Sequence, residues 1–70
     1  MMERLTCREM EILLLRVNGY TRKDIAEELR ITVSTVKTHL ESIHRKLEVS
    51  NQAGLVNKAF ELGVVKANEN

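Results

Sequence analysis

The chain has 70 residues and a formal net charge of +1, with one cysteine and no proline. This length accommodates one small domain, its composition favours helices over strands, and a lone Cys7 excludes an internal disulfide bond, which fits a reducing cytoplasm. No apolar run approaches the ~20 residues that a helix needs to span a membrane, so we expect no membrane contact.

The first predicted helix begins after Thr6. Thr6 and Glu9 have the spacing of a capping box, in which the Thr6 oxygen accepts from the Glu9 amide and the Glu9 side chain accepts from the Thr6 amide. We expect this helix to run to about Asn18. Gly19 then ends it, because glycine suits the left-handed position that follows a last helical turn.

The second predicted helix spans residues 22–29. Thr21 is its N-cap, and the carboxylate of Asp24 in the first turn suits the helix dipole. One face is apolar, and its residues are Ile25, Ala26 and Leu29.

The third predicted helix spans residues 33–47 and is capped by Thr32. Only three residues, Arg30 to Thr32, separate it from the second helix, and so short a turn is typical of a helix-turn-helix. Its apolar residues recur at helical spacing and predict a buried stripe: Val36, Leu40, Ile43 and Leu47.

The fourth predicted helix is capped by Ser50, spans about residues 51–62 and ends at Gly63. It carries two apolar stripes, Leu55, Ala59 and Leu62 on one face and Ala53, Val56 and Phe60 on another. One stripe should serve the core. The other either joins two chains or is also needed by the core of so small a bundle.

These elements predict an all-α, four-helix helix-turn-helix domain in which the helix at 33–47 is the recognition helix. We divide the chain into an N-terminal tail at 1–4, the domain at 5–65 and a frayed C-terminal tail at 66–70. Val64 and Val65 are expected to pack back on the core.

Four segments of the chain carry the residues of a known signature in the same order and spacing: "LTCREMEIL", "GYTRKDIAEELRIT", "STVKTHLESIHRKLEVSN" and "GVV". On these residues the chain resembles the LuxR/GerE-type DNA-binding domain over nearly its whole length. The resemblance implies a helix that enters the DNA major groove, usually in a dimer. Departures from the usual family pattern occur at Leu14, Arg16, Arg30, Gln52 and Gly54.

Three residues of the recognition helix are expected to contact bases, and the family resemblance places base contacts at the same positions. Lys37, Thr38 and Glu41 project together from its first two turns, the part that reaches base edges. Lysine donates to guanine, threonine offers a hydroxyl and a methyl group, and glutamate accepts from cytosine N4. Glu41 has an alternative role, an ion pair with Arg45.

Phosphate contacts are expected from basic and hydroxyl residues at helix ends: Lys23, Ser34, Thr35, Arg45 and Lys46. Thr35 has a second interpretation, support of the helix start. The resemblance also implies a homodimer through the fourth helix, for which we select Ala53, Val56 and Phe60. Two recognition helices would then meet an inverted repeat.

The sequence offers little other chemistry. His39 and His44 are five residues apart and do not share a helix face, and Cys7 has no second ligand cluster, so we expect no metal and no cofactor. We also expect no catalysis. The predicted function is bacterial transcription regulation on double-stranded DNA, in the cytoplasm and on the nucleoid, with RNA polymerase as a candidate partner. A promoter-reading sigma-like domain and a protein–protein interaction module of the same fold are the alternatives.

Overall fold

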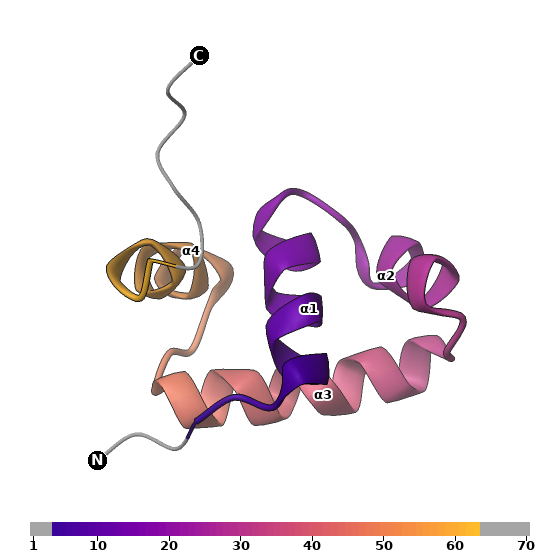
Figure 1. Ribbon diagram of the computed structural model, residues 1–70, viewed down its shortest axis with the longest axis horizontal. Coiled ribbons are helices and arrows are strands. Elements are labelled where there is room, and N and C mark those ends of the chain that lie inside the picture. The colour runs from indigo at the N-terminus through magenta and orange to yellow at the C-terminus, as the bar shows by residue number, and fades with distance from the viewer. Residues whose placement is uncertain (1–3, 64–70) are drawn as a thin grey trace.

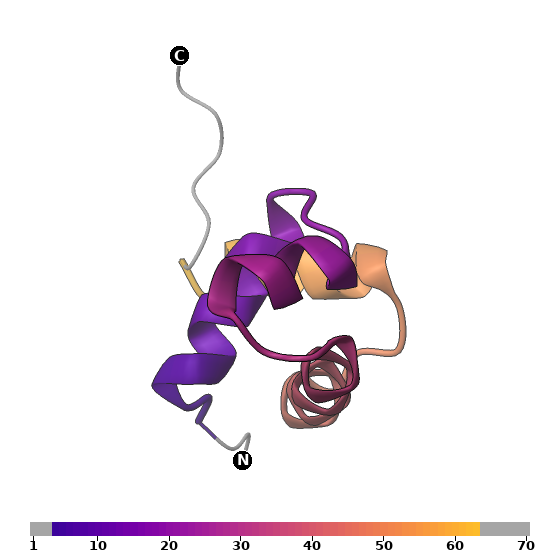
Figure 2. The same cartoon turned by 90° about the vertical axis from the view of Figure 1, so that its right-hand side faces the viewer.

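A computed structural model describes residues 4–63. These residues form four helices and no strand: α1 (Cys7–Val17), α2 (Arg22–Leu29), α3 (Val33–Leu47) and α4 (Gln52–Glu61). In Figure 1, α3 lies along the base, α1 stands over its middle, and α2 and α4 lie near its two ends. Figure 2 views α3 almost end-on and shows α1 and α2 on the same side of it. The predicted four-helix fold is confirmed, while the expected packing of Val64 and Val65 lies outside the described residues.

The core is built on one stripe of α3. Each residue of the predicted stripe is at most 4% exposed, and α3, like α1, packs against all three other helices. Burying one such side chain contributes about 1.5–3 kcal/mol. The other helices add the remaining core residues: Ile12 and Leu13 from α1, Ile25 and Ala26 from α2, and Leu55 and Ala59 from α4.

Side-chain caps begin the first three helices as predicted. The Glu9 amide donates to Thr6 Oγ1 at 3.0 Å, and the Thr6 amide donates to Glu9 Oε1 at 2.8 Å. Thr21 and Asp24 form the same reciprocal box before α2, and the backbone and side-chain hydrogen bonds from Thr21 lower the pKa of Asp24. Local hydrogen bonds therefore determine where these helices start.

The start of α4 differs from the prediction. Asn51, not Ser50, is the N-cap, and its Oδ1 accepts from the Gly54 amide at 2.8 Å. The residues before Asn51 still belong to the end of α3, because the Val49 amide donates to His44 O at 3.0 Å. The chain therefore enters α4 one residue later than predicted. A Cβ on Gly54 would lie 3.3 Å from Val49 Cβ, and glycine therefore lets α4 begin close to this loop.

A left-handed residue follows each of the four helices. Gly19 after α1 has φ 96°, as the sequence predicts, and Gly63 after α4 has φ 73°, but Arg30 after α2 and Glu48 after α3 have φ 59° and φ 58°. After Gly19, Arg30 and Glu48 the next amide bonds back across the last turn, at 3.0–3.1 Å. This closure is easy for glycine and costs an L-residue about 1–2 kcal/mol. Arg30 and Glu48 therefore carry local strain.

A nearly buried carboxylate joins α1 to α3. Glu9, which is 3% exposed, accepts from Lys46 Nζ at 2.8 Å and from Ser42 Oγ at 2.7 Å, in addition to its bond from Thr6. Burial by itself would raise the pKa of Glu9. Hydrogen bonds from Lys46, Thr6 and Ser42 and the charge of Lys46 outweigh burial and lower the pKa to about 2. The cluster sets how α1 sits on the C-terminal half of α3.

Replacement of Glu48 by glycine should stabilise the domain. Glycine removes the left-handed strain at this position, although it also increases the freedom of the unfolded chain, so we expect a gain of about 0.5–1 kcal/mol in the free energy of unfolding. The same change at exposed Glu27, inside α2, should cost about 1 kcal/mol. Urea unfolding of both variants measures the difference, and a loss of stability in Glu48→Gly would contradict strain at this position.

Glu9→Gln should destabilise the domain in a pH-dependent way. The folded pKa lies below the ordinary value of 4.5, so the stabilisation is complete above pH 4.5 and is lost as the pH falls towards 2. At pH 7 we expect a loss of about 1.5–3 kcal/mol, the contribution of hydrogen bonds to a charged group. Exposed Glu61→Gln, which removes only a 3.5 Å pair with Lys58, is the control. An equal deficit for Glu9→Gln at pH 7 and pH 2.5 would contradict this account.

Candidate nucleic-acid interface

The outward face of α3 carries the three residues predicted to contact bases. Lys37, Thr38 and Glu41 are all exposed, because the buried stripe turns this side of the helix towards solvent. The Thr38 hydroxyl donates to Ser34 O at 3.1 Å, which leaves its oxygen lone pairs and methyl group available. Between residues 4 and 63 Glu41 forms no ion pair, so the alternative pairing with Arg45 is not found there.

The N-terminus of α3 carries two residues predicted to contact phosphate. Ser34 and Thr35 are both exposed. The Thr35 hydroxyl lies 2.9 Å from Thr32 Oγ1, and the Thr35 amide donates to the same oxygen at 3.1 Å. Thr35 thus supports the helix start, the second interpretation that the sequence left open. Ser34 is the less engaged of the two hydroxyl groups.

The three predicted basic contacts lie in different surroundings. Lys23 is exposed in the first turn of α2, and Arg45 is exposed near the end of α3, where its Nη2 lies 3.5 Å from Ser42 Oγ. Lys46 differs, because its side chain is only 12% exposed and its ammonium group is held by Glu9. The sequence missed this structural role of Lys46. A phosphate contact by Lys46 stays a prediction, and it would require the ammonium group to share or leave the carboxylate.

The two stripes of α4 have separate surroundings. Leu55 and Ala59 are buried in the core, whereas Phe60 is 45% exposed, Ala53 is exposed and Val56 is half-buried. Leu62, which the sequence pattern grouped with Leu55 and Ala59 on one face, does not share their burial, since it is also 45% exposed. The helix ends at Glu61, which leaves Leu62 beyond the last turn. The core therefore does not use the whole of the second stripe.

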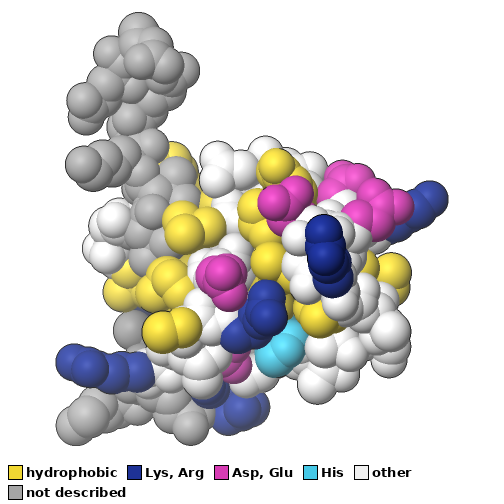
Figure 3. Space-filling model, turned by 45° about the vertical axis from the view of Figure 1, so that its right-hand side comes forward, with side chains coloured by type: hydrophobic (Ala, Val, Ile, Leu, Met, Phe, Trp, Pro, Cys, Tyr) yellow, Lys and Arg dark blue, Asp and Glu magenta, His cyan; other side chains and the backbone are white. Residues whose placement is uncertain are grey.

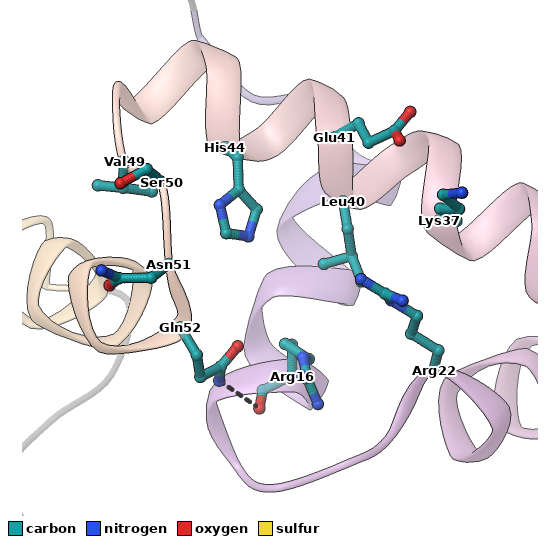
Figure 4. Close-up of a pocket in the computed structure, with 10 residues that line it drawn as sticks. All are labelled: Arg16, Arg22, Lys37, Leu40, Glu41, His44, Val49, Ser50, Asn51 and Gln52. Carbon is teal, nitrogen blue, oxygen red and sulfur yellow. Dashed lines mark hydrogen bonds between the residues drawn. The ribbon is translucent and has the colours of Figure 1, made fainter.

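A hollow of about 460 Å³ lies beside the outward face of α3 (Figure 4). Lys37, Glu41 and His44 line it from α3, while its other walls come from the end of α1, the start of α2 and the segment that leads into α4. Neither Arg16 nor Arg22 is a site residue predicted from the sequence. No local motif connects them, because only the packing of α1, α2 and α4 around α3 brings them together.

The face in Figure 3 is mixed in charge. Some acidic side chains lie together at the upper right and others lie singly, while Lys, Arg and His side chains are interspersed with apolar ones. Asp24, Glu27 and Glu28 are exposed on α2. Basic side chains on this face are therefore interrupted by acidic and apolar ones. Within residues 4–63 there is no group of His, Cys, Asp and Glu side chains arranged to hold a metal ion, and every helix is too short or too polar to span a bilayer.

Comparison with known proteins identifies relatives of this architecture. Residues 3–59 match the family described as "Bacterial regulatory proteins, luxR family". The response regulator protein VraR of Staphylococcus aureus is 47% identical over 64 residues, which are 91% of this chain and 31% of VraR. The transcription factor GerE superposes with a TM-score of 0.80 at 37% identity, over 89% of this chain and 92% of GerE.

A further solved structure is VqmA of Vibrio cholerae in a complex with a ligand and DNA. It superposes with a TM-score of 0.82 at 26% identity, over 91% of this chain and 28% of that one. The chain thus spans less than a third of VraR and of VqmA, and nearly all of GerE. The family match covers most of the chain and the four-helix architecture agrees with it, so the chain belongs to the luxR family of bacterial regulatory proteins, which are DNA-binding transcription regulators and not a class of enzymes.

Proposed function

We propose that this chain binds double-stranded DNA in a sequence-specific manner and inserts α3 into the major groove, as a transcriptional regulator or the DNA-binding part of one. The observation that carries this proposal is the outward face of α3. Three polar side chains are exposed there on a helix whose opposite side is fixed in the core. A rigid helix with exposed polar groups in its first turns suits base recognition.

Each of the three residues suits a different base edge. Lys37 is a donor for guanine O6 and N7, and Glu41 is an acceptor for the amino group of cytosine. Thr38 already donates its hydroxyl proton to Ser34 O. It would therefore act through its methyl group, on thymine, or as an acceptor. Glu41 also repels phosphate, which lowers general affinity and makes binding depend more on the correct bases.

Phosphate contacts would fix the orientation of α3 in the groove. Lys23, Ser34 and Arg45 are exposed and suited to this role, and Thr35 would contribute beside its bond to Thr32. Lys46 would contribute only at the expense of its ion pair with Glu9. These contacts add affinity without reading sequence.

The second stripe of α4 would join two chains. Ala53, Val56 and Phe60 leave an apolar surface that the core does not fully cover. A symmetric pair through this surface would place two recognition helices ~34 Å apart, one turn of DNA, on an inverted repeat. The dimer would act in the bacterial cytoplasm, on the nucleoid, with RNA polymerase as a further partner.

Relatives support the same proposal. VqmA, which shares this fold at 26% identity, has been solved in a complex that contains DNA. VraR is a response regulator, and the matching segment is 31% of its length. We therefore assign DNA recognition to the part of VraR that matches this chain. Regulation of VraR by the rest of its sequence is a property of VraR and is not assigned to this chain.

Lys37→Ala should relax sequence choice. In a selection from random duplex DNA, we expect the wild-type chain to enrich a motif and the variant to lose preference at one position per half-site, by about 1–3 kcal/mol of discrimination. Arg8→Ala, on the exposed surface of α1, is the control. An unchanged motif in Lys37→Ala would remove Lys37 from base reading. No enrichment by the folded wild type at low salt would favour a protein–protein interaction module instead.

Phe60→Ser should weaken binding to an inverted repeat and leave binding to a single half-site unchanged. Removal of an apolar interface side chain should reduce affinity for the repeat about tenfold, or about 1.4 kcal/mol. Leu62→Ser is a matched control, because Leu62 is equally exposed but lies outside the stripe. Fluorescence anisotropy with both duplexes measures the effect. Equal losses on the repeat and on the half-site would contradict a dimer through α4.

A further inference from the structure

The hollow beside α3 gathers positive charge from three helices. Arg16 comes from the last turn of α1, Arg22 from the first residue of α2 and Lys37 from the first half of α3. Glu41 is the one acidic residue in its lining. Three cations against one carboxylate exceed the formal net charge of +1 for the whole chain. The positive charge of this hollow is thus local and cannot be seen from the net charge of the chain.

The side chains are placed to receive an anion. In Figure 4 the His44 ring points from α3 into the hollow, and Arg22 reaches in from α2 beneath Leu40. The Glu41 carboxylate points away from His44 and Gln52. The side chains of Arg22, Lys37 and His44 form no hydrogen bond or ion pair with other residues in the range 4–63, so their side-chain donors are available.

Two bonds hold the floor of the hollow in place. Arg16 Nη1 donates to Tyr20 O at 2.9 Å, which uses one donor of the guanidinium group and leaves the others. Gln52 Nε2 lies 3.5 Å from Arg16 O and bridges α4 to α1. The position of Arg16 is therefore determined before any ligand arrives.

We propose that this hollow seats a backbone phosphate of the DNA strand that borders the groove occupied by α3, with Arg22 and Arg16 as its principal contacts. The inference rests on the proposed function and extends it to residues outside the outward face of α3. Lys37 lines the hollow and also belongs to the outward face of α3, so the hollow and the proposed base-reading surface are adjacent.

The shape of the hollow favours a polymeric anion over a small one. Leu40 is the one buried residue of its lining, and the other lining residues are exposed or half-buried. An isolated anion would stay largely hydrated in so open a place. A phosphate of a duplex that is already bound to α3 is held close to the hollow by the other protein–DNA contacts. It therefore loses little further translational and rotational entropy when it enters the hollow.

The test compares Arg22→Gln with the wild-type chain on one specific and one unrelated duplex. We expect the variant to bind both about five- to tenfold more weakly near 0.1 M salt, and the slope of log K against log salt to fall by about 1. Arg22→Lys should restore most of the slope, because it keeps the charge. Arg8→Gln, at the other end of α1, is the matched control and should leave the slope unchanged. Thermal unfolding followed by circular dichroism verifies that each variant is folded.

A second measurement locates the phosphate. Neutral methylphosphonates replace single phosphates of the specific duplex, one position at a time. At one position beside the occupied groove, the wild type should lose about fivefold in affinity and Arg22→Gln should lose nothing further, since the partner is already absent. Identical penalties in both proteins at every position would overturn the assignment. So would an unchanged salt slope in Arg22→Gln, or a loss confined to one sequence.

The two proposals fail in different ways. If the folded wild-type chain shows no salt-dependent binding to any duplex, the proposed function is wrong and the phosphate seat is wrong with it. If the wild type binds and selects DNA but Arg22→Gln behaves like Arg8→Gln, the proposed function stands and only the phosphate seat is overturned. An acidic protein segment would then be the remaining candidate for the hollow.

Discussion

The structure depends on the burial of one face of α3. Val36, Leu40, Ile43 and Leu47 lie at the centre of a core to which the three other helices contribute. So small a domain has few other apolar residues to bury, and this helix therefore cannot rotate without opening the core. The same constraint turns Lys37, Thr38 and Glu41 towards solvent. Stability and the proposed recognition are two consequences of one amphipathic pattern.

Glu9 adds direction to this packing. Apolar contacts by themselves tolerate small rotations of one helix on another, whereas charged hydrogen bonds require particular distances and angles. Glu9 caps α1 and also binds Lys46 and Ser42 on α3, so a local helix start is joined to a tertiary contact. Charged residues of α1 and α3 thereby help to orient α3 in the domain.

Charge in this domain is arranged locally. A net charge of +1 gives little long-range attraction to DNA, and α2 exposes three carboxylates, those of Asp24, Glu27 and Glu28. Under the proposed function, the cations in the hollow beside α3 would attract the duplex where it lies. Glu41, on the outward face of α3, would oppose indiscriminate phosphate binding. Such a distribution favours specificity over general affinity for nucleic acid.

The sequence by itself determined the features that depend on neighbours three or four residues apart. The caps at Thr6, Thr21 and Thr32, the bounds of α2 and α3, the buried stripe and the residues opposite it were all predictable, because helix starts and faces are local. Only the tertiary structure decided which stripe of α4 is buried, where α4 begins, that Lys46 pairs with Glu9 across 37 residues, and that Arg16 and Arg22 share a hollow. These features depend on how the helices pack against one another, and no periodicity within a single helix encodes the position of its neighbour.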